Sequence, residues 1–128
     1  MSLTNSFETS VLTWLLTTGT PSPVRPTAWY LGLFTAAPGE AGGGTEISGS
    51  AYARQSFSFT VSGDTASNTS AIEFPTATGS WGTITHVAVF DAVTTGNMIA
   101  YATLTASKVI DTGDVLRVPS GDLDITLN

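Results

Sequence analysis

The sequence lacks cysteine and contains few charged residues. The absence of cysteine excludes disulfides, thiolate metal sites and a cysteine nucleophile. Charged residues make up only 11% of the 128 positions, compared with about 25% in an ordinary soluble protein. The net charge is −6, and the four basic residues, Arg25, Arg54, Lys108 and Arg117, are scattered along the chain. Recognition of phosphates requires clustered cations, so we expect no nucleic-acid partner and no anionic membrane surface as a partner.

Long apolar runs are missing as well. No segment approaches the ~20 consecutive apolar residues that span a bilayer. Residues 1–10 carry no basic region, and no apolar run there is followed by a cleavage site of small residues. The sequence therefore predicts neither a signal peptide nor a membrane partner.

Threonine, serine and glycine take the place of the missing charges. Threonine and serine together occupy 36 of the 128 positions, and 13 more are glycine. The branched threonine side chain favours strands, whereas serine and glycine favour turns. A chain of this length is typical of one domain with a single core. The composition thus indicates a single, mainly β domain.

One segment, residues 5–18, has the pattern of a helix. Asn5 is a candidate N-cap, and Glu8, three residues later, completes a candidate capping box. Helical spacing predicts one apolar face made of Phe7, Val11, Leu12, Trp14, Leu15 and Leu16. Three prolines within residues 21–26 predict an extended connector after the helix. This helix either covers the core of its own domain or serves as an arm that docks on a partner. We therefore divide the chain into residues 1–27, a possible docking arm, and residues 28–128.

The remainder of the chain reads as strands separated by turns. Apolar runs or alternation predict strands at 28–35, 51–61, 71–74, 83–92, 98–105, 108–110, 115–118 and 123–127. Within 51–61, Phe57, Phe59 and Val61 alternate with polar residues and should share one face. Residues 83–92 and 98–105 should form a hairpin, and 62–70 a polar turn. The pattern predicts a single antiparallel β-sandwich or barrel-like domain of seven to eight strands with one N-terminal α-helix.

No residue pattern indicates catalysis or a cofactor. His86 is the only histidine and lies in an apolar run, so we interpret it as a hydrogen-bonded strand residue. The acids Asp111, Asp114, Asp122 and Asp124 lack the spacing of known calcium loops. We expect them to form turns and solvent-facing strand positions, with calcium binding as the alternative. The sequence therefore predicts no enzyme, no cofactor and no metal site.

The three tryptophans offer a second alternative, a carbohydrate platform. Trp14 and Trp29 lie in apolar runs, where burial is expected, whereas Trp81 lies between Ser80 and Gly82 and should be partly exposed. The run Gly42–Gly44 lacks the lysine and the following helix of a phosphate loop.

A glycine-rich loop over residues 36–50 is the main candidate for an interface. It is longer than an ordinary hairpin loop, and long loops on small β domains often become ordered against a partner. The residues that we expect to carry contacts are Gly42, Gly43, Gly44, Thr45, Glu46, Ile47, Tyr52 and Arg54, followed by Phe7 and Trp14 on the helix. For Arg54 an ion pair within the chain, with Glu40 or Glu46, is an equal alternative.

Three phrases carry a resemblance to a known family. They are YLGLFTAAPGEAGGGTEISGSAYARQSFSF, IEFPTATGSWGTITHVAVFDAVTTGNMIAYATL and KVIDTGDVLRVPSGDLDITL. Together they resemble small bacteriophage virion proteins, whose members are often labelled tail fibre proteins. Some similar small β proteins are capsid decoration, or cement, proteins. The resemblance covers roughly residues 28–127 and implies a virion structural protein made in the host cytoplasm.

Within that resemblance, the composition favours a decoration protein on the outer surface of the phage head. An acidic chain suits the side of the shell away from packaged DNA, and few charges need desolvation at its contacts. The expected partners are the major capsid protein and copies of the chain itself, which we expect to form a homo-trimer at a threefold site. The alternative is a tail-tip or tail-fibre component that binds a host receptor.

Overall fold

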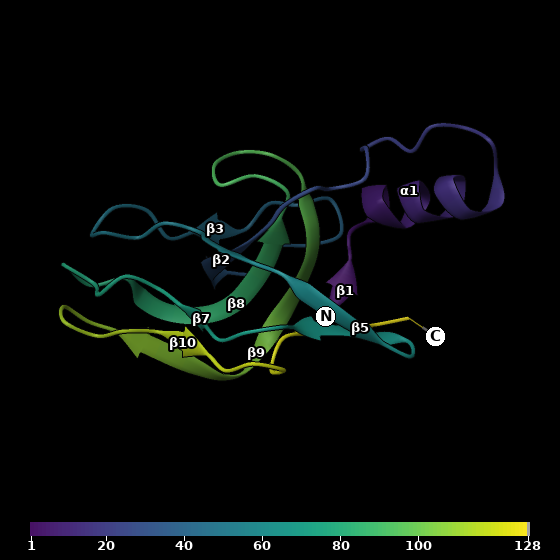
Figure 1. The fold of residues 1–128 in the computed structure, drawn as a ribbon. Helices are drawn as coiled ribbons and strands as arrows, with labels where there is room; N and C mark the ends of the chain where they lie inside the picture. Colours follow the sequence, from purple (N-terminus) through teal and green to yellow (C-terminus); the bar gives the residue numbers. More distant parts are fainter. Residues whose placement is uncertain (128) are drawn as a thin grey trace.

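The computed structural model describes residues 1–127, which form one helix and eleven strands (Figure 1). The helix is α1 (Asn5–Leu16). The strands, in chain order, are β1 (Ser2–Leu3), β2 (Trp29–Ala36), β3 (Thr45–Glu46), β4 (Gln55–Phe57), β5 (Phe59–Ser62), β6 (Thr65–Asn68), β7 (Ile72–Glu73), β8 (Gly82–Phe90), β9 (Met98–Ile110), β10 (Arg117–Val118) and β11 (Asp124–Thr126). The expectation of a mainly β, antiparallel fold with an N-terminal helix is confirmed. The strands outnumber the seven to eight expected because several have only two to four residues.

A six-stranded antiparallel sheet forms the centre of the molecule. Its order is β1-β9-β8-β2-β3, and β4 also pairs with β2. The predicted hairpin is present as β8 and β9, with Val89 opposite Ala100. The register between β2 and β8 places Leu31 opposite Val89 and Gly32 opposite Ala88. Because successive residues of a strand point to opposite faces, leucines and valines line one face, and the other face carries Gly32 and Ala88.

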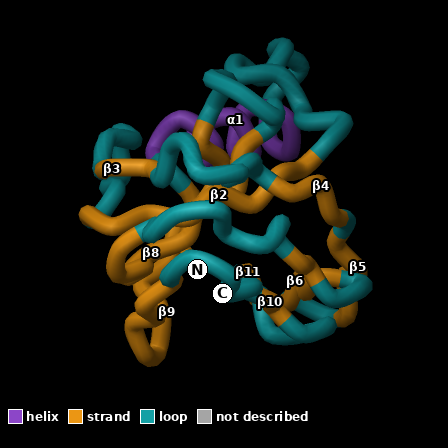
Figure 2. Tube along the Cα trace, turned by 90° about the vertical axis from the view of Figure 1, so that its left-hand side faces the viewer, coloured by secondary structure: helices purple, strands orange, loops and turns teal. Residues whose placement is uncertain are grey.

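The first face packs against a second layer made of two small sheets. These are β10-β7 and the three-stranded sheet β11-β6-β5, which lies below α1 in the view of Figure 2. The core between the layers includes Leu31, Leu33, Ile72, Phe74, Trp81, Ile84, Val87, Val89, Leu116 and Leu123. The opposite face of the central sheet carries a smaller cluster of Phe34, Ala88 and Phe90, with Met98 and Tyr101 packed against it.

Two predicted segments in the middle of the chain need correction. Residues 51–61 do not form one strand, because the chain leaves β2 after β4 and joins the other layer as β5. Val61 is therefore 72% exposed, whereas the two phenylalanines are half-buried. The predicted turn at 62–70 contains β6, which pairs with both β5 and β11.

Two further segments are more regular than expected. The loop predicted over 36–50 contains β3, which pairs with β2. The predicted strands 98–105 and 108–110 are one strand, β9, which continues along β8 as far as Ile110. The β domain was predicted to extend to residue 128, and this residue lies outside those that the structure describes.

The helix begins and ends differently from the prediction. Thr4, not Asn5, is the N-cap, and the helix ends at Leu16 instead of residue 18. The Thr4 hydroxyl donates to the Met98 carbonyl at 2.7 Å, so it makes no cap with the helix. The predicted capping box between Asn5 and Glu8 is therefore wrong. Within residues 1–127, no helix has the length and apolar character that crossing a bilayer requires.

The single apolar face predicted for the helix is also wrong. Only Phe7 and Ser10 of α1 are buried. Leu12, Leu15 and Leu16 are 57%, 63% and 71% exposed, because the second half of α1 projects from the side of the β domain (Figure 1).

Candidate interaction surfaces

Arg54 lies at the centre of the predicted interface and is bound within the chain. Its Nε donates to Glu46 Oε2 and its Nη2 to Glu46 Oε1, both at 2.8 Å. Its Nη1 donates to the carbonyls of Ala92 and Thr95, at 2.9 and 2.8 Å. The guanidinium carbon lies 3.4 Å from the centre of the Phe90 ring, a cation–π contact. The predicted alternative, an internal ion pair from loop to strand, is therefore confirmed with Glu46 as the partner.

Tyr52 connects the same carboxylate to the core. Its hydroxyl donates to Glu46 Oε2 at 2.6 Å and accepts the Leu33 N–H at 3.0 Å. Its ring contacts Trp81 edge to face, with centroids 5.5 Å apart, and stacks near Phe74. Burial, then the hydrogen bond to Glu46, raise the pKa of Tyr52 far above the ordinary tyrosine value. Tyr52 therefore remains a neutral donor at physiological pH.

Gly32 leaves the space that this arrangement needs. A Cβ at residue 32 would lie 2.8 Å from Glu46 Oε2, 3.1 Å from the Phe90 ring and 3.3 Å from the Tyr52 hydroxyl. Only glycine allows the carboxylate and the ring to approach the backbone this closely. Gly32, Glu46, Tyr52, Arg54 and Phe90, which we call the Arg54 cluster, tie β2, β3 and β8 to the turn after β8.

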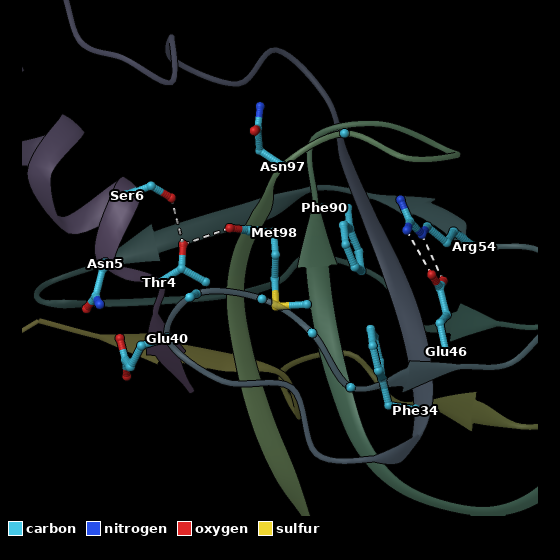
Figure 3. A pocket seen from close by; sticks show the side chains of 15 residues that line it. Thr4, Asn5, Ser6, Phe34, Glu40, Glu46, Arg54, Phe90, Asn97 and Met98 are labelled. Carbon is cyan, nitrogen blue, oxygen red and sulfur yellow. Dashed lines mark hydrogen bonds and ion pairs between the residues drawn. The ribbon is translucent and has the colours of Figure 1, made fainter.

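The exposed part of the predicted interface lies at the rim of an open pocket of about 620 Å³. Gly43 and Gly44 line this pocket and are exposed, Thr45 is exposed but does not line it, and Ile47 is buried in the core. Figure 3 shows Phe34, Phe90 and Met98, from three neighbouring strands, side by side in this pocket. Thr4, Asn5 and Ser6, where α1 begins, also line this pocket. The interface assigned to these residues remains a prediction.

The other candidate polar residues have local partners. His86 Nδ1 is 2.7 Å from the hydroxyl of Thr85, so the hydrogen-bonded strand residue expected there is present. Asp114 accepts a hydrogen bond from the Asp111 N–H, as expected of an acid that forms a turn. Among residues 1–127, no three histidine, aspartate or glutamate side chains come together in a group that could hold a metal ion.

Trp81 and Trp14 have the opposite exposures to those expected from the sequence. Trp81 is buried, at 4% exposure, and its Nε1 donates to the Ser50 carbonyl at 2.9 Å, because the apolar ring fills the core beside Tyr52. Trp14 is 61% exposed, because α1 extends beyond the β domain before it reaches this residue. A carbohydrate platform through Trp81 is therefore contradicted by its burial.

Phe7 and Trp14, the second pair of predicted contact residues, occupy different surroundings. Phe7 is 4% exposed and belongs to the core. Trp14 lines a groove of about 290 Å³ with Val11 and the prolines at 21, 23 and 26. The pattern of apolar residues identified both, but it could not show that the β domain covers only the first half of the helix.

Two positioning residues gave no signal in the sequence. Thr4 is buried and binds the Met98 carbonyl, which fixes the start of α1 on β9. Asn68 is 2% exposed and bonds three backbone groups, donating to the Ser70 and Pro119 carbonyls and accepting the Leu123 N–H. It therefore holds the C-terminal segment on β6. Threonine is common throughout this chain, and Asn68 lies in a segment that reads as a polar turn, so only the distant partners distinguish these two residues.

One known protein family matches nearly the whole chain. The family model described as "Podophage GP4 fiber I protein gp80" matches residues 2–126. Among curated proteins, the search finds no match. The family match includes α1 and the proline connector as well as the β domain, and thus extends the resemblance seen in residues 28–127. It confirms the expectation of a small structural protein of a phage virion. The chain belongs to the Podophage GP4 fiber I protein gp80 family.

Proposed function

We propose that the chain is a fibre subunit of a phage virion and that α1 with the proline connector attaches it to neighbouring protein. The observation that carries this proposal is the exposed apolar surface of Leu12, Trp14, Leu15, Leu16 and Val24, which we call the arm patch. These side chains are 57–71% exposed. Five large apolar side chains in one short segment are typical of a surface that a partner covers.

The β domain suits a displayed module. The Arg54 cluster and the core satisfy their own polar groups, and no buried side-chain nitrogen or oxygen among the described residues lacks a hydrogen-bond partner. Such a domain needs no partner to satisfy its buried polar groups. We therefore assign the contact with a partner to the arm. The family name, which describes a fibre protein, supports the fibre over the capsid decoration protein that we expected from composition.

A decoration protein remains the second candidate because of one observation, the net charge of −6 on a chain with only four basic residues. That charge suits the outer side of a shell filled with DNA. The two candidates differ in location and number. A decoration protein occupies the head in many copies, whereas a fibre subunit occupies the fibres in few.

The test is to label purified virions with gold-conjugated antibodies against this chain and to count its copies against the major capsid protein by quantitative mass spectrometry. We expect label on fibres and a copy number far below that of the capsid protein. Label spread over the head, with a copy number comparable to that of the capsid protein, would overturn the fibre and support the decoration protein.

A further inference from the structure

β9 carries a large bulge where it passes β8. The register pairs His86 with Thr103 and then Ile84 with Lys108. One residue of β8 therefore faces four residues of β9, 104–107, and in the described part of the chain none of these four has a partner in the register with β8 or β1. A bulge interrupts the ladder of hydrogen bonds, so it leaves backbone N–H and C=O groups of this segment available to another strand.

An open pocket of about 450 Å³ lies against this bulge. Leu104, Thr105 and Ala106 line it from the bulge itself. The rest of its apolar lining comes from β8, from β10 and from the core residues beside β10, namely Val87, Leu116, Val118 and Leu123. The pocket therefore lies between the central sheet and the second layer, and an aliphatic side chain that entered it would contact the edge of the core.

Basic residues gather at this pocket. Lys108, at the end of the bulge, and Arg117, on β10, are two of the four basic residues of the chain, and both line it, whereas Asp122 is the one acidic residue of its lining. Both basic residues are exposed, and within residues 1–127 neither forms an ion pair, although Glu73 lies opposite Arg117 in the register. The lining is thus net positive on a chain whose net charge is −6, which suits a carboxylate.

From these observations we infer that this pocket, which we call the bulge pocket, binds an extended acidic peptide segment of another protein. Backbone groups of the bulge would pair with the backbone of the segment, as in recognition by strand addition. Successive side chains of an extended segment point to opposite sides. An aliphatic residue can therefore enter the apolar lining while an acidic neighbour reaches Lys108 or Arg117.

The chain's own acidic strands do not supply this segment. The strands that carry an acidic residue, β3, β7 and β11, are already paired within the domain, with β2, β10 and β6. We therefore assign the segment to a different protein. The contact belongs to the β domain and is additional to the attachment proposed for the arm.

The first experiment uses nuclear magnetic resonance on the isotope-labelled full chain, with a short capped peptide in which aspartate and leucine alternate as the probe. In the free chain the amides of residues 104–107 should exchange rapidly, because no strand covers them. The peptide should shift their resonances and slow their exchange, and a peptide with lysine in place of aspartate should do neither. Slow exchange in the free chain, no response to the acidic peptide, or equal responses to the two peptides would overturn the inference.

The second experiment tests the basic residues by charge reversal. Lys108→Glu and Arg117→Glu should each weaken binding of the acidic peptide by about tenfold or more, and Lys108→Arg should retain it. Because the two residues lie on different strands, misfolding of one variant leaves the other as a test.

Arg25→Glu is the matched control for these variants. It changes the net charge by the same amount at an exposed residue that does not line the bulge pocket, and it should leave the affinity unchanged. Equal weakening by the control, or no weakening by either variant in the pocket, would contradict the inference. Both experiments use the purified chain, so their outcome is independent of whether the chain is found on fibres or on the head.

Discussion

The guanidinium of Arg54 binds both carboxylate oxygens of Glu46, each at 2.8 Å, in a site where the two side chains are only 8% and 23% exposed. This pair connects the strand after the glycine run to the segment before β4. Two carbonyls of the turn after β8 occupy the remaining guanidinium nitrogen. Arg54 therefore joins two neighbouring segments to a turn about forty residues away, and its first role is structural.

Removal of Arg54 should strongly destabilise the domain. Arg54→Ala leaves the Glu46 carboxylate half-buried without its partner and should lower the free energy of unfolding by about 2–4 kcal/mol, measured by urea denaturation. Arg54→Lys should recover only part of this loss, because lysine cannot bind both oxygens and two carbonyls together. Lys108→Ala removes an exposed cation as the control and should change stability by less than about 0.5 kcal/mol. Equal effects of Arg54→Ala and Lys108→Ala would refute the role given to the pair.

Tyr52 should make the protein sensitive to alkali. Its pKa is raised in the folded state, so stability is complete below the ordinary tyrosine pKa of about 10 and is lost as pH rises above it, when the unfolded chain releases the proton first. The expected slope is at most about 1.4 kcal/mol per pH unit for this group. The measurement is the free energy of unfolding between neutral pH and pH values above 10, for wild type and Tyr52→Phe. The variant should show a shallower decline, and parallel curves would contradict the assignment.

Glycine at residue 32 should resist even the smallest substitution. In Gly32→Ala the new methyl group would meet the Glu46 carboxylate and the Phe90 ring, both fixed by Arg54, and stability should fall by about 1–3 kcal/mol. Gly39→Ala is the matched control, since its nearest neighbour would be a carbonyl oxygen at 3.9 Å. Thermal unfolding of the two variants should therefore separate them clearly. A neutral Gly32→Ala would mean that the Arg54 cluster can shift to make room.

Asn68 should be the polar side chain of the second layer that is most sensitive to substitution. Asn68→Ala leaves the buried Leu123 N–H and the Ser70 carbonyl without the partner that Asn68 provides, and we expect a loss of about 2–4 kcal/mol. Faster hydrogen exchange at the Leu123 amide should accompany it. Asn97→Ala, which removes one exposed hydrogen bond to Asp91, should cost less than about 1 kcal/mol. If the Leu123 amide exchanged at the wild-type rate in Asn68→Ala, its bond to Asn68 would not matter for local stability.

The sequence predicted the two middle strands of the central sheet, β2 and β8, well because both are largely apolar on their two faces. Residues 28–35 and 83–92 read as covered strands, and both lie in the middle of the sheet. The short strands were missed or merged because their pairing partners, not their side chains, define them. Three of the four residues of Thr65–Asn68 are polar, yet this strand pairs on both sides.

The candidate site was predicted in part for a similar reason. An ion pair of Arg54 with Glu40 or Glu46 was one of two predicted alternatives, and the structure pairs Arg54 with Glu46. The hydrogen bond from Tyr52 to the same carboxylate was not predicted. Gly32 and the two turn carbonyls could not be predicted, because their role depends on strand register and on a turn about forty residues away. For the helix, the apolar residues were recognised but their burial was not. Apolar spacing predicts that a face is covered, but it cannot say whether the same chain or another one covers it.

The central claim is that the arm patch attaches the chain to its virion. The most direct measurement is the amount of this chain per purified particle in phage that carry Leu15→Glu, compared with phage that carry the matched Leu127→Glu. We predict that the arm variant is depleted from particles although it is present in the infected cell, and that the control is retained at the wild-type level. Retention of both variants at that level would contradict the account.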